Sequence, residues 1–595
     1  MEQYMKHYEL WSGDPYFDEL TRAELLAIRS NPGEIEERFY RELEFGTGGL
    51  RGIIGAGTNR INRYTVAKAT AALARYVRSA DPDAMQRGVV ISYDSRHRST
   101  EFAEVAAGTL ASEGVSVLLF DLLRPVPLLS FAVRHYGAYA GIMITASHNP
   151  PKYNGYKVYG EDGGQMTPEA ADEIIKQMNN ICDIRTIRPL SVEEAQAAGK
   201  LRYIGEELDE AYTEMLTELV IDRPSIEKHR NMSIVYTPIH GSGNLPVRRI
   251  LSRVGFSNVH VVPEQELPDG NFPTVNVPNP EDPNALKLAV QLAVRVEADL
   301  VIGTDPDCDR VGISVRDKGT GEYRSLTGNQ IGLLLLDYIL GYKKESGTLP
   351  ERSFAVTSIV SSRLAGAICA HYGVELQETL TGFKFIGERI RIDDEEGDKH
   401  FQFGFEESFG YLSGLSVRDK DAVVAVMLIA GMAAQSIERG QTLIERLEDL
   451  FERFGFGAEE AVSYTLEGKE GTEKIKAAME SLREEARLLD AESARSIFGD
   501  YGVHAIRDYQ RSRRYEYDSD APIVTDIELP ESDVLYYEMG GEKGLDWVCV
   551  RPSGTEPKLK VYFGVYADTR TAAEHTLREI KRCVTRRVSE RLGID

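Results

Sequence analysis

Ser147 stands in a loop whose residue types could support nucleophilic chemistry. The loop runs Thr145-Ala-Ser-His-Asn-Pro-Pro-Lys152 and follows residues 140–144, an apolar run typical of a β-strand. A serine that leaves a strand into a proline-stiffened loop presents its hydroxyl group to a cleft. Because Ser, Asn and Pro are also ordinary turn residues, the loop alone is equally compatible with a plain turn. His148, next in the sequence, could assist the serine or only position the loop.

Three aspartates at alternating positions form a candidate metal site. Asp305, Asp307 and Asp309 lie between two apolar runs that read as strands, residues 300–303 and 311–315. Carboxylate oxygens at this spacing suit a hard divalent cation such as Mg²⁺. The alternative is a solvated acidic turn. The two strands would hold the three charges close together, where repulsion is costly without a cation, so the metal site is favoured.

Two further loops carry groups that could bind a sugar phosphate. In residues 404–411, Glu406 and Ser408 lie between glycines and could hydrogen-bond the vicinal hydroxyls of a sugar, although this signal is weak by itself. In residues 551–557, a guanidinium, two hydroxyls and the backbone N–H groups around a glycine make a possible nest for a non-reacting phosphate. Between the apparent strands 546–550 and 560–563, the same residues could form only a decorated β-turn.

The elements that must position these loops alternate between strands and helices. Short apolar runs, including residues 88–94, 140–145 and 300–303, are each followed by a polar loop and a helical stretch. This alternation predicts α/β layers with parallel or mixed sheets, in which ligands bind at the carboxyl ends of strands. A chain of 595 residues is too long for one core and requires several domains. The apolar run 422–434 is too short to span a membrane and predicts a buried core helix.

The two ends of the chain and one internal stretch are expected to differ from this pattern. Helix starts are predicted at Thr21, paired with Glu24 in a capping box, and at Asn31-Pro32, so residues 1–44 form a helical extension. The proline-rich residues 263–283 predict an extended connection. Residues 456–500 are predicted to be helical and to lead into the last domain.

Composition excludes several functional classes. A net charge of −25 argues against nucleic acid or an anionic membrane as the main partner, because both require a basic surface. Five widely spaced cysteines without a C-x-x-C pair make a disulfide framework or a zinc site unexpected, and the N-terminal residues lack a secretory signal. Both observations favour a cytoplasmic protein. The common nucleotide-binding motifs are missing as well.

Taken together and in this order, the loops resemble the motifs of the α-D-phosphohexomutase superfamily, the phosphoglucomutases and phosphomannomutases. The resemblance rests on T-A-S-H-N-P with the downstream N-G-Y-K, on D-P-D-x-D-R, on E-E-S-F-G and on R-P-S-G-T-E-P, and it spans residues 45–565. The opening segment 46–52 and the long helical lead are most similar to the branch that holds bacterial α-phosphoglucomutases and the related phosphopentomutase or glucose-1,6-bisphosphate synthase proteins.

The resemblance implies four domains around a central cleft: three related mixed-sheet α/β domains and a smaller C-terminal α+β domain similar to the TATA-binding protein. The implied boundaries are an extension at 1–44, a phosphoserine domain at 45–205, a metal-binding domain at 206–325, a sugar-binding domain at 326–455, and linker helices with a phosphate-binding domain at 456–595.

The resemblance also implies residue roles. Ser147 would carry the phosphoryl group and, with Asp305, Asp307 and Asp309, would hold one Mg²⁺ per chain. Arg51 and Arg310 would neutralise the transferring group. Lys157, with Lys420 as a second candidate and His148 as a possible helper, would move the proton of the sugar hydroxyl, its pKa lowered by nearby positive charge. The implied substrate-binding residues are Thr381, Gly382, Lys384, Glu406, Ser408, Arg551, Ser553, Gly554 and Thr555.

The implied activity is interconversion of glucose 1-phosphate and glucose 6-phosphate, with glucose 1,6-bisphosphate as activator and intermediate. The sequence leaves open a phosphomannomutase, a phosphopentomutase and a glucose-1,6-bisphosphate synthase. A non-catalytic sugar-phosphate sensor is a different class, disfavoured because a sensor needs neither the serine nor the aspartates. The expected partners are small sugar phosphates, and the chain is expected to be a monomer or a dimer.

Overall fold

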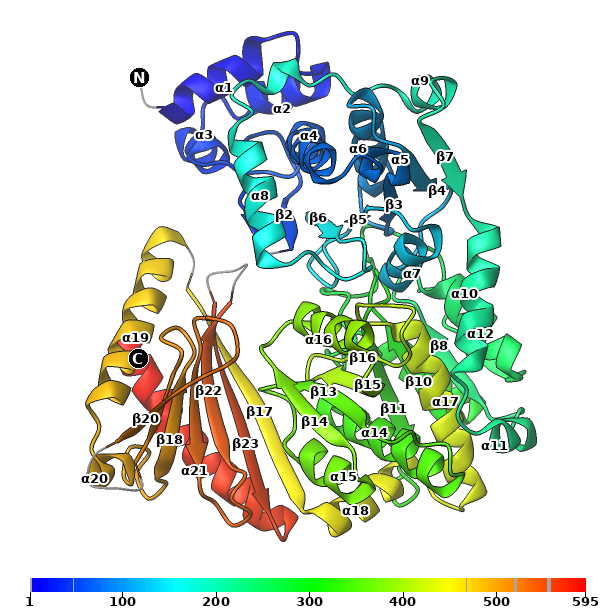
Figure 1. The fold of residues 1–595 in the computed structure, drawn as a ribbon, viewed down its shortest axis with the longest axis vertical. Coiled ribbons are helices and arrows are strands. Elements are labelled where there is room, and N and C mark those ends of the chain that lie inside the picture. Colours follow the sequence, from blue (N-terminus) through cyan, green and yellow to red (C-terminus); the bar gives the residue numbers. More distant parts are fainter. Residues whose placement is uncertain (1–2, 47, 467, 518–521, 554–557, 595) are drawn as a thin grey trace.

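The computed structural model describes residues 3–594 except 47, 467, 518–521 and 554–557. Four β-sheets lie one after another along the chain, and each is covered by helices (Figure 1). The predicted architecture of three mixed-sheet α/β units and a C-terminal α+β unit is therefore confirmed. The predicted domain boundaries and the likeness of the last unit to the TATA-binding protein stay predictions.

The N-terminal extension consists of three helices. These are α1 (Gln3–Gly13), α2 (Glu19–Ala27) and α3 (Pro32–Phe39). Asn31 caps α3 as predicted, since its side chain accepts a hydrogen bond from the Glu34 backbone N–H group. The predicted start at Thr21 is wrong: Asp18 caps α2 and accepts the Thr21 backbone N–H group. The three helices form a small aromatic core around Trp11, which Tyr64 of the first unit completes.

The first sheet has seven strands in the order β1-β2-β6-β5-β3-β4-β7. The strands are β1 (Phe45–Gly46), β2 (Gly49–Ile53), β3 (Val89–Tyr93), β4 (Val117–Phe120), β5 (Ala140–Ile144), β6 (Tyr153–Tyr159) and β7 (Leu201–Ile204). The accompanying helices are α4 (Arg63–Ala80), α5 (Ala84–Arg87), α6 (Ser99–Ser112), α7 (Val126–Tyr136), α8 (Pro168–Asn179), α9 (Val192–Ala197) and α10 (Glu206–Glu218).

The second and third sheets are smaller. The second contains β8 (Ile234–Thr237), β9 (Val259–Val261), β10 (Leu300–Thr304), β11 (Val311–Arg316) and β12 (Tyr323–Ser325), with helices α11 (Arg223–Lys228), α12 (Asn244–Val254) and α13 (Lys287–Val296). The third contains β13 (Ser353–Ser358), β14 (Glu375–Thr379), β15 (His400–Glu406) and β16 (Gly410–Leu412), with helices α14 (Gly328–Glu345), α15 (Leu364–Tyr372), α16 (Phe383–Glu396), α17 (Ala422–Glu438) and α18 (Leu443–Phe454).

The three mixed sheets share one four-strand unit. In each, an antiparallel hairpin joins two further parallel strands, in the orders β6-β5-β3-β4, β11-β10-β8-β9 and β16-β15-β13-β14. The hairpin turns are equivalent in the three units. They contain, in order, Ser147, the three aspartates and Ser408. The same local device therefore presents three of the four predicted chemical loops.

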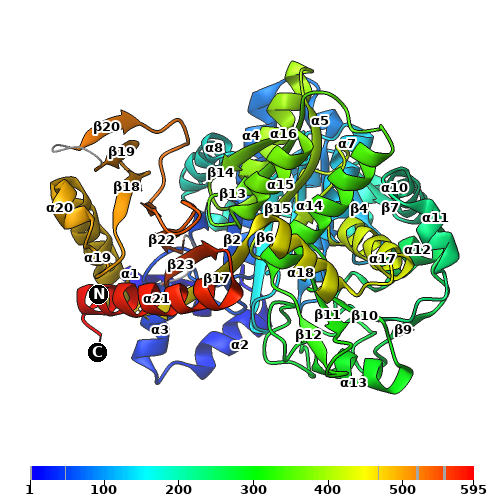
Figure 2. The same cartoon turned by 90° about the horizontal axis from the view of Figure 1, so that it is seen from below.

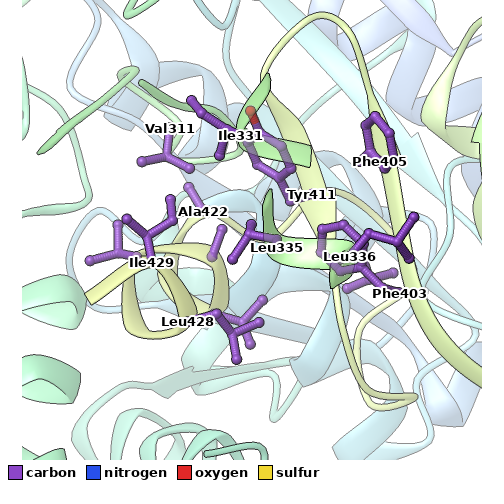
Figure 3. Packing of buried hydrophobic residues seen from close by; sticks show 14 of the residues in the cluster. Val311, Ile331, Leu335, Leu336, Phe403, Phe405, Tyr411, Ala422, Leu428 and Ile429 are labelled. Atoms are coloured by element: carbon purple, nitrogen blue, oxygen red, sulfur yellow. The ribbon is translucent and has the colours of Figure 1, made fainter. Parts of the chain in front are cut away.

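A continuous apolar core supports the third unit. Leu335 and Leu336 of α14 pack with Phe403 and Phe405 of β15, and Leu428 of α17 lies in the same cluster (Figure 3). The prediction of a buried core helix at 422–434 is confirmed by α17, whose residues from Ala422 to Ser436 are buried. Burial of this helix fixes the segment before it, which carries Lys420.

The fourth sheet is antiparallel throughout, with the order β17-β23-β22-β21-β18-β19-β20. Its strands are β17 (Phe456–Thr465), β18 (Val503–Asp508), β19 (Arg513–Glu516), β20 (Ile523–Asp526), β21 (Leu535–Met539), β22 (Trp547–Pro552) and β23 (Lys558–Ala567), and its helices are α19 (Gly468–Leu488), α20 (Ala491–Ala494) and α21 (Arg570–Leu592). The predicted hairpin near residues 546–563 is confirmed. The helical prediction for residues 456–500 is wrong at its start, because residues 456–465 form β17 along the edge of this sheet.

The fourth sheet and its helices lie on one side of the molecule in two perpendicular views (Figures 1 and 2). Helices α19 and α21 pack on one face of the sheet, which leaves the other face toward the remaining units. In the part of the chain that the structure describes, no single helix is long and apolar enough to cross a membrane, and α17 with α18 would do so only as a pair bent by 85°.

Candidate active site

A cavity of about 860 Å³ lies where the four units meet. Its walls come from the first sheet, the turn 305–310 that carries the three aspartates (the candidate metal loop), the third unit and the exposed face of the fourth sheet. The predicted residues that line it are Arg51, Ser147, His148, Lys157, Asp309, Arg310, Thr381, Gly382, Glu406, Ser408, Lys420, Arg551 and Ser553. Gly554 and Thr555 lie outside the described residues.

Ser147 faces the metal loop across a unit boundary. Its Oγ donates a hydrogen bond to Asp305 Oδ2 at 3.0 Å and lies 3.1 Å from His148 Nδ1. Ser147 adopts a left-handed backbone conformation with φ of 51°, which is uncommon for a residue other than glycine. Its backbone N–H group donates to Thr145 Oγ1, and the Thr145 hydroxyl in turn donates to the buried Asp94. Hydrogen bonds from the Ser147 backbone to Thr145, and from Thr145 to Asp94, therefore hold the serine in this strained conformation.

The three aspartates form one compact, buried cluster. One oxygen of each lies within 4.8 Å of the others. Asp305 Oδ1 accepts the backbone N–H groups of Asp309 and Arg310. Among the residues that the structure describes, Asp307 Oδ1 and Asp309 Oδ1 are buried and have no hydrogen-bond partner. Burial, reinforced by the charges of Asp307 and Asp309, raises the pKa of Asp305 well above its usual value. Unpartnered carboxylate oxygens in a repulsive cluster fit a hard divalent cation.

Two lysines reach this cluster from different units. Lys157 Nζ donates to Asp307 Oδ2 at 2.9 Å, and Lys420 Nζ lies 3.0 Å from Asp309 Oδ2. Burial lowers the pKa of both lysines. The adjacent carboxylates raise it by a larger amount, so the net shift of each pKa is upward. These upward shifts come from the protein's carboxylates, and the prediction that a metal ion and an arginine together lower the pKa of the catalytic lysine stays a prediction.

The arginines and histidine predicted to flank the reacting group also lie here. Arg310 pairs with Glu281, and its Nε lies 3.8 Å from Asp309 Oδ1. Arg51 Nη1 donates to the Asn149 side chain at 3.3 Å. Burial, followed by the charges of Arg310 and Arg51, lowers the pKa of His148 well below its usual value, which keeps the imidazole neutral. Glu281 comes from the irregular 263–283 stretch, whose sequence predicted only a connection.

Two of the predicted sugar-binding residues, Gly382 and Glu406, are hydrogen-bonded to each other within the third unit. Glu406 Oε1 accepts the backbone N–H group of Gly382 at 2.7 Å, and the φ of 125° at Gly382 favours glycine there. Burial raises the pKa of Glu406. Glu407, which the sequence reasoning missed, lines the same cavity; burial and the charge of Glu406 raise its pKa to about 7. The sequence did offer a sign of this role, since Glu407 lies between Glu406 and Ser408 in the same loop.

The fourth sheet contributes a basic surface. Arg551 on β22 lies opposite Lys560 on β23, and both line the cavity together with Lys558. Lys558 and Lys560 were missed, although their spacing of two residues in a strand puts them on the same face as each other. Ser553 is tied to this hairpin, since its backbone N–H group donates to the Lys558 carbonyl oxygen at 2.7 Å.

Lys384 is separated from the other predicted substrate-binding residues. It lines a second hollow of about 490 Å³ between the first and third units, with Arg391 and Arg418. Burial lowers its pKa. The neighbouring Gly382 and Phe383 line the central cavity instead. Its position in the first turn of α16 therefore does not bring Lys384 to the main site.

The site has a hydroxyl group and a buried aspartate cluster that fits a cation at one end, and three basic side chains at the other. This is the arrangement of an enzyme that transfers phosphoryl groups on a small anionic substrate. Residues 42–184, 210–319, 327–454 and 539–580 match, respectively, the alpha/beta/alpha domains I, II and III and the C-terminal domain of phosphoglucomutase/phosphomannomutase. The chain belongs to the phosphoglucomutase/phosphomannomutase family.

Full-length relatives agree with this assignment. A phosphoglucomutase of Staphylococcus epidermidis is 38% identical over 537 residues, which cover 90% of this chain and 93% of that protein. A phosphoglucomutase of Staphylococcus aureus is 38% identical over 537 residues, covering 89% of this chain and 91% of that one. The family resemblance inferred from the motifs is therefore confirmed.

Solved structures support the same fold. The open form of the Paramecium phosphoprotein pp63/parafusin, a phosphoglucomutase, superposes with a TM-score of 0.65 at 16% identity, covering 93% of this chain and 96% of that one. A phosphoglucomutase/phosphomannomutase family protein from Burkholderia thailandensis gives a TM-score of 0.63 at 17% identity, with coverage of 92% and 97%.

Proposed function

We propose that this chain is a phosphoglucomutase that interconverts glucose 1-phosphate and glucose 6-phosphate through phosphorylated Ser147 and bound glucose 1,6-bisphosphate. The observation that carries the proposal is the 3.0 Å contact between Ser147 and Asp305 at the wall of a cavity that all four units line. The phosphoglucomutase relatives at 38% identity support glucose phosphate as the substrate.

The reaction consists of two phosphoryl transfers in opposite directions. In the first, the bond between phosphorus and Ser147 Oγ breaks, a bond to the free sugar hydroxyl oxygen forms, and the hydroxyl proton passes to the neutral form of Lys157 or Lys420. The bisphosphate then turns in the cavity, and its other phosphate returns to Ser147, which takes the phosphoryl group while the sugar oxygen regains a proton. A covalent phosphoenzyme lets one reacting centre serve both ends of the sugar.

The residues at the reacting end neutralise and orient the transferring group. Asp305, Asp307 and Asp309 would hold Mg²⁺, which when bound stabilises the negative charge that develops on the phosphoryl oxygens. Arg51 and Arg310 lie beside the serine and the aspartates as guanidinium partners for those oxygens. Transfer of a phosphoryl group depends mainly on such positioning and charge, so these contacts supply most of what the protein must provide.

The remaining cavity residues hold the sugar and its second phosphate. The Glu406 carboxylate accepts hydrogen bonds from the sugar hydroxyls, and the Ser408 hydroxyl can donate to them or accept from them. Arg551 and Ser553, with Lys560, bind the phosphate that does not react in a given half-cycle. A guanidinium can bind phosphate through two parallel hydrogen bonds, which fixes the substrate's direction as well as its position.

The first test is conversion of glucose 1-phosphate to glucose 6-phosphate with Mg²⁺ and a trace of glucose 1,6-bisphosphate. Mannose 1-phosphate and ribose 1-phosphate are assayed in parallel to rank the sugars. The expected result is fastest turnover of glucose 1-phosphate, lost on chelation with EDTA and restored by Mg²⁺. In Ser147→Ala the rate should fall by at least about 10⁴-fold, since the nucleophile is removed.

Two results would contradict the proposal. Turnover that survives in a folded Ser147→Ala variant would exclude the phosphoserine route. Absence of turnover on all three sugars, with phosphate acquired by Ser147 from a glycolytic acyl phosphate, would instead indicate a bisphosphate synthase.

A further inference from the structure

Arg96 lies directly beneath the Ser147 loop, and its side chain is fully buried. Its Nη2 donates to the carbonyl oxygens of Ser147, at 2.6 Å, and of Asn149. Its Nη1 donates to the carbonyl oxygens of Pro150 and Tyr153, each at 3.0 Å. One guanidinium therefore collects four carbonyl groups from seven consecutive residues, 147–153, and turns them away from the cavity.

Asp94 connects Arg96 to the other side of the same loop. Asp94 Oδ2 lies 3.4 Å from Arg96 Nε and accepts the Thr145 hydroxyl at 2.7 Å. Thr145 Oγ1 accepts the Ser147 backbone N–H group at 2.8 Å. Arg96 thus fixes the carbonyl side of Ser147, while Asp94 fixes its amide side through Thr145. Fixing both sides holds the φ of 51° at Ser147.

The second unit closes over Arg96. The ring of Phe272, itself fully buried, lies 5.0 Å from the guanidinium carbon. A Cβ atom on Gly270 would lie 2.6 Å from the His97 backbone nitrogen, so the backbones of these two segments are in close contact. His97 Nε2 also lies 2.8 Å from Asn271 Oδ1. Arg96 therefore lies at the seam between the serine loop's unit and the unit that carries the three aspartates.

We infer that Arg96 is a positioning residue that holds Ser147 in the orientation needed for phosphoryl transfer and ties that orientation to the metal-binding unit. The inference rests on the proposed role of Ser147 as the phosphorylated residue. Lysine cannot replace arginine here, because its single ammonium group lacks the planar fork that reaches four carbonyl oxygens.

Arg96→Lys tests this inference against two references, the wild-type enzyme and Arg60→Lys. Arg60 is a buried arginine of the same unit whose contacts are with Glu37 and Asn59, away from the cavity. In Arg96→Lys, kcat and the rate at which Ser147 acquires phosphate from glucose 1,6-bisphosphate should both fall by about 10²-fold, because a displacement of about 1 Å costs this much. KM should change by less than about 3-fold, since ground-state binding is untouched.

Arg60→Lys should retain the wild-type rates, which separates positioning from a general loss of buried charge. Arg96→Lys with a kcat within about 3-fold of wild type would overturn the inference. So would a loss of activity that only matches the loss of folded protein, measured by circular dichroism.

Phe272→Leu provides an independent variant if Arg96→Lys does not fold. It removes the ring above the guanidinium and keeps an apolar side chain, so phosphate acquisition by Ser147 should slow by about 3- to 10-fold. An unchanged rate would overturn the inference. Failure of the wild-type protein to acquire phosphate would instead contradict the proposed function, whereas an active wild type with equally active variants would contradict the Arg96 role alone.

Discussion

The two ends of the central cavity are built in opposite ways. At the reacting end, Ser147, Asp305, Asp307 and Asp309 are each at most 3% exposed and come from equivalent hairpin turns of the first two units. At the other end, Arg551, Lys558 and Lys560 are partly exposed and lie on one antiparallel hairpin of the fourth sheet.

The connections behind the two ends differ as well. The serine and metal loops contact each other directly, and two lysines bridge the aspartates to neighbouring elements. The fourth sheet is joined to the third unit through residues other than these three, such as Asn329 with Glu459 at the cavity wall and Arg570 with Glu448. The reacting end is therefore preorganised for chemistry, and the basic end is suited to binding a phosphate. Variants at the first should change kcat, and variants at the second should change KM.

The largest change in kcat at the reacting end is expected from substitution of Lys420 and Lys157. Lys420 Nζ lies 3.0 Å from Asp309 Oδ2 and 5.5 Å from the centre of the Phe383 ring. Phe383 follows Gly382, whose backbone N–H group binds Glu406. Lys157 contacts Asp307 and Asp309. We propose that Lys420, the second candidate from the sequence, exchanges the sugar proton through the minor neutral form that its raised pKa leaves. Lys420→Met should then lower kcat by about 10²-fold or more, and Lys157→Met by about 10-fold. Steady-state kinetics at saturating Mg²⁺ measures both.

Lys343→Met serves as the control, because Lys343 is also partly buried but contacts Gln402, outside the cavity. It should behave as wild type. A larger loss of kcat in Lys157→Met than in Lys420→Met would reverse the assignment and place proton transfer beside Asp307.

A smaller effect, on KM, is expected at the basic end. Arg551→Ala should raise KM for glucose 1-phosphate by about 10- to 10²-fold, because a charge-assisted, two-pronged phosphate contact is lost. Ser147 should still acquire phosphate, as detected by intact-protein mass. Arg513→Ala removes an arginine of the same sheet that pairs with Asp526 on β20, and should leave KM unchanged. An Arg551→Ala variant with normal KM and reduced kcat would break the proposed division between the two ends.

The residues that meet at the reacting end could be picked out from the sequence because each set is local. Ser147 and the three aspartates each occupy one short loop after an apolar strand, and a strand followed by a polar turn is readable from residue types alone. The helix cap at Asn31 and the buried helix at 422–434 were predicted for the same reason. The cap at Asp18 was missed because both Asp18 and Thr21 are good capping residues, and only the observed bond to the Thr21 backbone decides between them.

Long-range contacts could not be predicted in this way. Arg96 and Glu281 act on loops 51 and 29 residues away in sequence, so no local pattern indicates their roles. Strand β17 was read as part of a helical segment because its exposed, acidic residues lack the apolar alternation of a half-buried strand. The upward pKa shift of the lysines depends on which charges lie nearest, and this follows from distances that a sequence does not contain.

The smallest expected effect links the two ends through Glu407. This partly buried carboxyl has a pKa raised to about 7, by burial first and then by the charge of Glu406, while Lys560 and Arg551 oppose the shift. Above pH 7 its carboxylate competes with substrate phosphate for those two cations, so KM should rise by a few-fold between pH 6 and pH 8. Glu407→Gln should flatten that profile, as measured by KM at fixed Mg²⁺.

The same shift has a consequence for stability with a definite sign. The pKa of Glu407 is higher in the folded chain than its ordinary value of 4.5, so the folded chain holds this proton more tightly. Its contribution to the free energy of unfolding therefore decreases as pH rises from about 4.5 to about 7 and stays low above that. Chemical denaturation at pH 5 and pH 8 should show Glu407→Gln gaining stability relative to wild type only at pH 8. A gain of equal size at both pH values would mean that Glu407 does not titrate in this range, and the KM profile would then need another group at the cavity wall.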